Sequence, residues 1–226
     1  MSENIIKLIK PADIITLINA LLGFASVIMI VQGRVDEALV LILLAVIADG
    51  ADGAFARYTG TGVLGANLDS LADVIAFGVA PATAAFVFLG SPAAWVFSGF
   101  FLVCGILRLA RFNVAGKKDG FEGIPITAGG FIVALFLLMR DYLRYFEYVF
   151  PLLLVLLSLL MVSTIGYPKI KKLSVLAPMG ILLAIDIASF YLNYAGIVKL
   201  VSLFLFVLAF VYILIPAGRR FYGRSK

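Results

Sequence analysis

The sequence predicts an all-α, polytopic membrane protein with about eight transmembrane helices. Hydrophobic residues make up 63% of its 226 residues and charged residues only 14%, whereas soluble domains are about half apolar and about a quarter charged. The apolar residues fall into runs that are long enough to cross a hydrocarbon core of ~30 Å as helices. Basic residues are concentrated in the segments that would lie on one side of such a bundle. We therefore expect a single integral membrane domain over residues 1–226.

Segments that contain glycine and proline separate the apolar runs and set where each helix is expected to end. In chain order these breaks are Gly33, Gly60 with Gly62, Gly90-Ser91-Pro92, Gly116–Gly120 and Gly166-Tyr167-Pro168. The helices expected around the breaks span residues 14–31, 37–57, 66–89, 92–112, 124–145, 148–165, 175–194 and 197–215. Each of them has at least the ~17 residues that a transmembrane helix needs.

Basic residues predict the orientation of the bundle. With eight spans, both termini lie on the same side, and 14 of the 18 Lys and Arg residues fall on that side. The other side receives Arg34, Arg140, Arg144 and Lys199. Because cytoplasmic loops carry the excess of Lys and Arg, both termini are expected in the cytoplasm of a multi-pass cell-membrane protein. A cytoplasmic face this basic suits anionic lipid head groups or phosphate substrates.

Two residue counts restrict the chemistry. The chain has no histidine, and its one cysteine, Cys104, lies within an apolar helix. These counts exclude imidazole bases, His-ligated zinc, Ser-His-Asp triads, intrachain disulfides and cysteine-cluster metal sites. A metal bound by the protein must take oxygen ligands, which favours Mg²⁺, Mn²⁺ or Ca²⁺.

Four of the 13 acidic residues lie inside the second and third predicted spans, where charges are costly and mark functional sites. Asp49 and Asp52 are three residues apart, so they share one face of their helix. Asp69 and Asp73 are four apart and share a face of the next helix. At ~1.5 Å per residue, Asp49 and Asp73 both lie roughly 10–12 Å from the cytoplasmic helix ends. Such converging carboxylates share protons or bind cations, and one or two hard divalent ions fit them best.

Small residues fill the sequence around these acids, among them Gly53, Ala56 and Gly65. Small residues let membrane helices pack closely, and they also leave a groove in which a ligand can lie against the backbone. Arg57 closes the stretch at the membrane surface, either as an interfacial anchor or as a phosphate ligand beside a metal. The residues alone leave both pairs of alternatives open.

The acidic segment resembles a known signature. Asp49-Gly50-Ala51-Asp52-Gly53-Ala54-Phe55-Ala56-Arg57, followed after seven residues by Gly65-x-x-x-Asp69-x-x-x-Asp73, is similar to the pattern of the CDP-alcohol phosphotransferase family, and all eight fixed positions match. Members of that family use an alcohol to displace CMP from a CDP-linked lipid or alcohol, with divalent metals. The resemblance therefore implies a metal-dependent transferase.

Three further segments resemble one branch of the family. Arg108–Asn113, Phe121–Ala128 and the opening Thr16-Leu17-Ile18-Asn19-x-x-x-Gly23 are similar to the branch that joins CDP-diacylglycerol to serine. This resemblance implies transfer of the phosphatidyl group from CDP-diacylglycerol to the hydroxyl of L-serine, with release of CMP. It also implies a homodimer and no nucleic-acid partner.

The resemblance also implies roles for individual residues. The expected metal ligands are Asp49, Asp52 and Asp69, with Asp73 as the general base and a possible further ligand. The nucleotide and pyrophosphate are expected to contact Asn19, Gly53, Ala56, Arg57 and Gly65. The lipid phosphate or serine is expected to contact Arg108, Arg111, Asn113 and Lys117.

Two other functions compete with this hypothesis. A sibling enzyme would run the same chemistry with glycerol phosphate or an inositol phosphate as the acceptor, and such acceptors need extra cations for a second phosphate. A divalent-cation transporter would use the acidic residues as a transport site. A transporter needs a path through the membrane, however, and the predicted acids gather near one face only.

Overall fold

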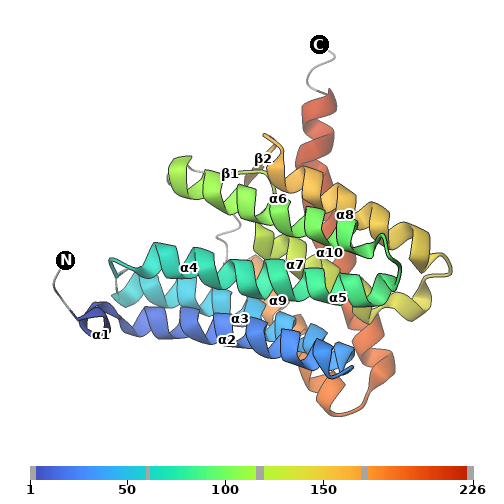
Figure 1. Cartoon of the computed structure of the whole chain (residues 1–226), viewed down its shortest axis with the longest axis horizontal. Coiled ribbons are helices and arrows are strands. Elements are labelled where there is room, and N and C mark those ends of the chain that lie inside the picture. Colours follow the sequence, from blue (N-terminus) through green and yellow to red (C-terminus); the bar gives the residue numbers. More distant parts are fainter. Residues whose placement is uncertain (1–3, 60–61, 116–119, 169–172, 223–226) are drawn as a thin grey trace.

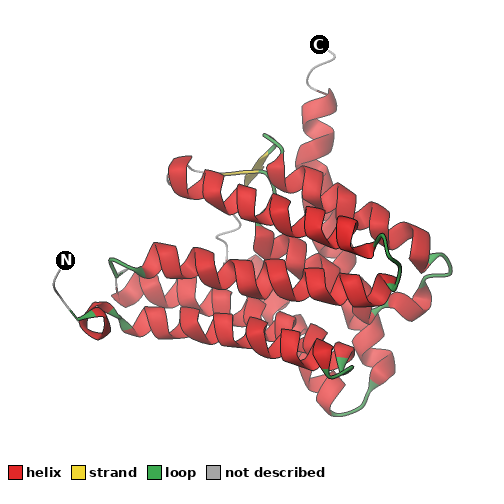
Figure 2. Cartoon of the chain, viewed as in Figure 1, coloured by secondary structure: helices red, strands yellow, loops and turns green. Residues whose placement is uncertain are grey.

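A computed structural model shows a bundle of helices with one short pair of strands (Figures 1 and 2). The structure describes residues 4–59, 62–115, 120–168 and 173–222. The helices are α1 (Ile5–Leu8), α2 (Pro11–Val31), α3 (Val35–Thr59), α4 (Gly65–Asp73), η1 (Val74–Val79), α5 (Ala80–Leu89), α6 (Ala94–Ala115), α7 (Ile126–Leu138), η2 (Arg140–Tyr142), α8 (Phe146–Val162), α9 (Leu173–Tyr191) and α10 (Ala195–Tyr222). The strands are β1 (Gly120–Glu122) and β2 (Gly166–Pro168). The all-α class is confirmed.

Apart from the single turn α1, the described helical segments follow one another in the predicted order, with α4, η1 and α5 forming one uninterrupted segment. Among the described residues, four helices are long and apolar enough to cross a membrane, namely Pro11–Val31, Gly65–Leu89, Ala94–Val114 and Ala195–Leu214. Shorter apolar helices accompany them at Ile126–Leu138, Phe146–Val162 and Leu176–Tyr191. The chain is therefore an integral membrane protein with several apolar helices.

The fifth helix is shorter than the sequence predicts. A helix was expected over residues 124–145, whereas α7 ends at Leu138 and a 3₁₀ turn, η2, follows. Pro125 precedes α7 and has extended backbone, with φ of −60° and ψ of 146°. Its ring fixes φ near this value. At the other end of α7, Arg140 and Asp141 form ion pairs with neighbouring helices, and the chain turns at these residues.

Two hydrogen bonds fix how α2 and α3 lie side by side. The Ser26 hydroxyl donates to the carbonyl of Ala38 at 2.9 Å, and the Thr16 hydroxyl donates to the carboxylate of Asp52. The two helices are therefore antiparallel, and residues later in α2 lie beside residues earlier in α3. By this register Asn19, which is three residues after Thr16, lies at the level of Asp49.

The third segment departs from α-helical geometry directly after Asp73, where η1 forms a π-helical turn. Glycines bring the neighbouring helices against this turn. A Cβ at Gly23 of α2 would lie 2.5 Å from the Cα of Ala76, and one at Gly130 of α7 would lie 2.9 Å from the Cα of Phe77. Such close backbone contacts are typical of membrane helices that meet at small residues, and π-turns are frequent at functional sites.

The core surrounds α7, which is buried along almost its whole length. It packs against α3, η1 and α10. Helix α7 is apolar all round, as expected for a helix with neighbours on every side. In contrast, α2 buries one face and exposes large apolar side chains on the other, as expected for a lipid-facing helix. In Figure 1, α10 crosses the direction shared by α2, α3 and α4.

The strands were not predicted from the sequence. β1 pairs antiparallel with β2, with Gly120 opposite Pro168 and Glu122 opposite Gly166. This ribbon joins the segment before α7 to the segment after α8, so two loops far apart in the sequence are held together. A three-residue strand is too short to produce an alternating pattern that a sequence could reveal.

Candidate active site

One face of α2 carries a row of buried polar residues. Asp13, Thr16 and Asn19 are spaced three residues apart and are all buried against the bundle. Thr16 donates to the carboxylate of Asp52. Asn19 is only 1% exposed, and its Oδ1 atom has no hydrogen-bond partner among the described residues. Polar groups are rarely left this way in a membrane helix, so this face of α2 belongs to a site.

Three aspartates converge beside this face. Asp49 of α3 and Asp69 and Asp73 of α4 each place a carboxylate oxygen within 4.8 Å of the others. Asp73 is 6% exposed, and its Oδ1 atom lacks a hydrogen-bond partner within the described part of the chain. Because carboxylates at this separation repel one another strongly, the group needs a compensating charge.

The fourth aspartate of the signature stands beside this group rather than in it. Asp52 is 8% exposed and lies on the face of α3 that carries Asp49. Its carboxylate accepts the hydrogen bond from Thr16. The sequence predicted convergence of all four acids, and the structure brings three of them together and holds the fourth through α2.

The donor set of this group fits a metal ion. All of its ligand atoms are carboxylate oxygens, which hard divalent cations prefer. The chain offers no histidine, and Cys104 is buried at another place in α6. Asp73 also presents a buried oxygen that no described residue satisfies. The three acids can therefore bind a divalent ion.

A buried arginine lies next to the acids. Arg108 of α6 is 6% exposed and interacts electrostatically with Asp73 and Asp69. Its guanidinium also lies 5.2 Å from the ring centre of Phe112. A buried guanidinium offers fixed donors to a carboxylate or phosphate, so Arg108 places an anion-binding group at the edge of the acidic cluster.

The first turn of α7 closes another side of the site. The hydroxyl of Thr127 lies near the Asp49 carboxylate and interacts with it. Thr127 and Thr16 both lie in segments that the sequence analysis singled out, yet neither received a role there. Their hydroxyls were missed because a threonine in an apolar helix gives no signal until its partner is known.

The glycines of the signature differ in what surrounds them. A Cβ at Gly50 or Gly53 would meet no atom within 4 Å, so the surface of α3 beside the acids is open. A Cβ at Gly65 would lie 3.2 Å from Oδ1 of Asp13. The structure thus provides room at Gly53, whereas Gly65 permits the close approach of α2.

The remaining predicted residues lie on the rim or outside the described part. The side-chain amide of Asn113 donates to the Ser70 hydroxyl at 3.0 Å, which ties α6 to α4. Arg111 of α6 donates to the carbonyls of Glu122, Met161 and Val162. Lys117 lies outside the described residues, as do the side chains of Ala56 and Arg57.

Comparison with known proteins agrees with this geometry. The CDP-alcohol phosphatidyltransferase family matches residues 10–165, which include the whole signature. A CDP-diacylglycerol–serine O-phosphatidyltransferase of Methanocaldococcus jannaschii is 39% identical over 168 residues, covering 74% of this chain and 77% of the relative. An archaetidylserine synthase of Methanothermobacter thermautotrophicus is 35% identical over 178 residues, covering 74% and 73%. A CDP-diacylglycerol–serine O-phosphatidyltransferase of Helicobacter pylori is 37% identical over 171 residues, covering 71% and 72%.

The family match covers the helices that build the site, from the polar face of α2 through the acids of α3 and α4 to Arg108 and the start of α7. With the signature complete and three of its four acids gathered at one place, this chain belongs to the CDP-alcohol phosphatidyltransferase family.

Proposed function

We propose that this protein is a phosphatidylserine synthase that transfers the phosphatidyl group of CDP-diacylglycerol to the hydroxyl of L-serine and releases CMP. The observation that carries the chemistry is the group of three carboxylates inside the family signature. The choice of serine rests on the relatives, because the three described above are all named for serine products or acceptors.

In this proposal Asp49, Asp52, Asp69 and Asp73 hold one or two divalent cations, Mg²⁺ or Mn²⁺. A bound cation supplies charge neutralisation on the pyrophosphate and orients the CMP leaving group. The hydrogen bond from Thr16 keeps the Asp52 carboxylate turned toward α2. The nearby hydroxyl of Thr127 is proposed to orient Asp49 from the side of α7.

The nucleotide of the donor is proposed to lie along the open surface of α3. Gly53 leaves space there, and Asn19, at the same level of the site, has an amide oxygen that no described residue satisfies. The nucleotide-binding roles expected from the resemblance stay predictions for Gly65, Ala56 and Arg57. Gly65 would act indirectly, through its contact with Asp13.

Asp73 is proposed to act as the general base. The serine hydroxyl attacks the phosphorus that carries diacylglycerol, a phosphorus–oxygen bond to serine forms, and the bond to CMP breaks. The proton of the hydroxyl passes to Asp73, whose buried Oδ1 atom is available for it among the described residues. Arg108 is close enough to Asp73 to bind the lipid phosphate or the serine carboxylate. Asn113 and Lys117 stay predictions as further anion contacts.

The proposal places eight spans in the membrane, both termini in the cytoplasm and the site open to the cytoplasmic side. The distribution of Lys and Arg supports this orientation. The acids lie in the second half of α3 and in α4, next to the basic side of the bundle. A homodimer, and one domain over residues 1–226, remain expectations from the resemblance and the composition.

A release assay tests the proposed function. Purified protein is incubated with CDP-diacylglycerol, Mg²⁺ or Mn²⁺, and serine, glycerol phosphate or inositol phosphate in turn, and CMP is measured. Serine is expected to support CMP release, and an archaetidyl donor is included because one relative is named for archaetidylserine. Release with a phosphorylated acceptor in place of serine would establish the sibling function. Flux of the cation into sealed vesicles without CMP release would establish transport.

A further inference from the structure

Arg111 is engaged by backbone groups of two other segments. Its Nη1 atom donates to the carbonyl of Val162 at 3.1 Å, and its Nη2 atom donates to Met161 at 3.1 Å and to Glu122 at 2.5 Å. Met161 and Val162 end α8, where the last carbonyls lack partners inside the helix. A cation at that place satisfies these groups and interacts favourably with the helix dipole.

The segment that Arg111 reaches is itself docked on the end of α8. The amide of Gly123 donates to the carbonyl of Ile165 at 2.9 Å, and the amide of Ile124 donates to Leu160 at 3.2 Å. Gly123 has φ of +74°, and a Cβ there would lie 2.8 Å from Nη2 of Arg111. Glycine is therefore required for the segment to approach both the guanidinium and α8.

The docked segment leads directly into α7. Pro125 precedes the helix, and Thr127 is the second residue of its first turn. Helix α7 packs against α3, which carries Asp49, and the Thr127 hydroxyl lies near enough to the Asp49 carboxylate to interact with it. The position of the first turn therefore sets this contact. The connection from Glu122 to Thr127 is short and contains a proline, which leaves little freedom to absorb a shift of one end.

We infer that Arg111 is a positioning residue, which pins the segment before α7 to the end of α8 and thereby sets Thr127 against the Asp49 carboxylate. The inference rests on the proposed function, because it concerns how the acids of that site are held. It differs from the role as a ligand of lipid phosphate or serine that the sequence predicts for Arg111.

Substitution of Arg111 and Thr127, singly and together, tests this inference. Arg111→Lys keeps the charge and removes the planar fork of donors, and Thr127→Val removes the hydroxyl at nearly constant size. Each is expected to lower kcat by roughly tenfold, within the loss that a misplacement of about 1 Å can cause. The KM values for serine and CDP-diacylglycerol should stay within about twofold of the wild type. Thr127→Ser should restore most of kcat.

The double variant decides whether the two residues act through one another. If they do, the kcat of the double variant should lie within about twofold of that of the less active single variant, because both substitutions disrupt the same contact. Arg144→Lys is the matched control, since Arg144 is an exposed arginine of the loop before α8. It should behave as the wild type.

Three results would overturn the inference. One is multiplicative loss in the double variant, and another is a selective rise in the KM for serine or CDP-diacylglycerol in Arg111→Lys with kcat retained. The third is unchanged kcat in Thr127→Val, which needs no Arg111 variant and so holds even if those fail to fold. Failure of the proposed function is distinct from all three, because wild-type protein would then release no CMP with serine.

Discussion

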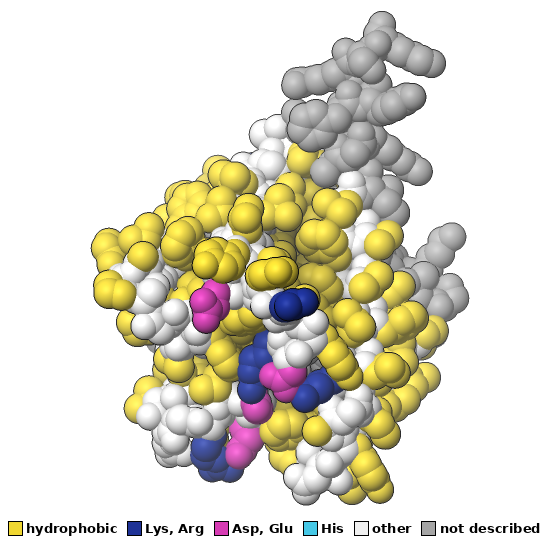
Figure 3. Space-filling view, turned by 90° about the vertical axis from the view of Figure 1, so that its right-hand side faces the viewer, with side chains coloured by type: hydrophobic (Ala, Val, Ile, Leu, Met, Phe, Trp, Pro, Cys, Tyr) yellow, Lys and Arg dark blue, Asp and Glu magenta, His cyan; other side chains and the backbone are white. Residues whose placement is uncertain are grey.

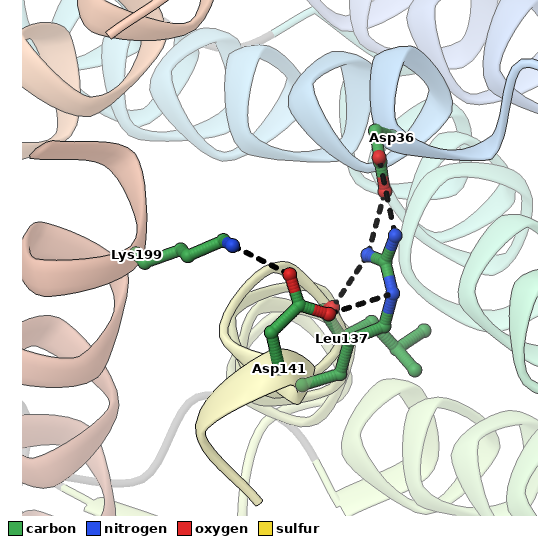
Figure 4. A network of polar contacts seen from close by, with 5 residues as sticks. Asp36, Leu137, Asp141 and Lys199 are labelled. Carbon is green, nitrogen blue, oxygen red and sulfur yellow. Dashed lines mark hydrogen bonds and ion pairs between the residues drawn. The ribbon is translucent and has the colours of Figure 1, made fainter. Parts of the chain in front are cut away.

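Two groups of acidic residues in this bundle differ in their surroundings. At one end Asp36 pairs with Arg140 through contacts of 2.7 and 3.2 Å, and Asp141 pairs with Lys199 at 2.5 Å (Figure 4). Near the other end, three carboxylates lie within 4.8 Å of one another. Asp36 and Asp49 are both on α3, roughly 20 Å apart by the helical rise.

The charges of the paired end have partners within the chain. Arg140 also donates to the carbonyl of Leu137 at 2.9 Å and lies over the ring of Phe88 at 4.9 Å. Figure 3 shows basic and acidic side chains next to one another within a mostly hydrophobic face. The contacts of Arg140 and Asp141 join α3, η2, α5 and α10, and they hold these helix ends together.

At the aspartate cluster, acids outnumber the buried cation that faces them. Arg108 is the buried basic side chain of the described residues, and Asp49, Asp69 and Asp73 gather beside it. The comparison of the two groups indicates that an acid near the end of a membrane helix stabilises the fold where the chain itself supplies the pairing cation. An excess of acids over cations within the bundle marks a place where the cation comes from solution.

The largest expected effect separates a cluster acid from a buried acid elsewhere. Asp49→Asn removes a negative ligand at constant size and should abolish CMP release, as should EDTA on the wild type, reversibly. Asp186→Asn is the control, because Asp186 is a buried aspartate that is bonded to Ser202 at 2.8 Å on another pair of helices. Full activity of Asp49→Asn, or of the wild type in EDTA, would end the metal proposal.

The next prediction distinguishes a base from a ligand within the cluster. If Asp73 accepts the serine proton, Asp73→Asn should lower kcat by roughly 10²–10⁴-fold and leave binding of CDP-diacylglycerol and metal largely intact. Calorimetry of metal-dependent lipid binding and CMP release at saturating serine measure both on one preparation. Parallel loss of binding and turnover would show that Asp73 acts mainly as a ligand.

A smaller effect is expected from the hydrogen bond that holds Asp52. Thr16→Val keeps the shape of the side chain and removes the donor, whereas Thr16→Ser keeps the donor. Because a hydrogen bond to a charged group contributes about 1.5–3 kcal/mol, Thr16→Val should raise the Mn²⁺ concentration for half-maximal activity by roughly tenfold or more. Thr16→Ser should stay near the wild-type value. Equal values for the two variants would mean that the bond does not position Asp52.

The sequence predicted the parts of this site that follow from spacing along one helix. The positions of Asp49 and Asp73 at a common depth needed only the helical rise and a short turn between antiparallel helices. The order of the helices followed from glycine and proline breaks. The end of α7 at Leu138 was not predictable in this way, because the ion pairs of Arg140 and Asp141 form only in the folded bundle.

Contacts between helices were also beyond the sequence. An apolar membrane helix gives no clear periodicity that shows which side faces its neighbours, so the partners of Thr16 and Thr127 could not be assigned. The same holds for Arg111, because an arginine at a helix end can bind either a substrate or a backbone carbonyl. Only the meeting of α6, α8 and the segment around Gly123 distinguishes between them.

The smallest effect concerns the paired end. The hydrogen bond and charge of Lys199 hold the pKa of the Asp141 carboxyl below its usual range. A carboxyl whose pKa is lower in the folded state contributes stability that is fully present above the unfolded value near 4, and that is lost as pH falls through the folded value. Asp141 is exposed, so screening by solvent limits the contribution to about 1 kcal/mol or less.

Asp141→Asn should therefore lower the melting temperature slightly at pH 6, and the difference from the wild type should vanish as the pH falls below about 4. CMP release at saturating substrate should be unchanged, because this pair lies at the opposite end of the bundle from the acids of the site. Melting curves at several pH values measure the effect. They are recorded with and without about 0.5 M salt, roughly three times the physiological ionic strength, which screens the ion pair. A large loss of activity in Asp141→Asn would show that the two ends are coupled, and that the paired acids do more than join helix ends.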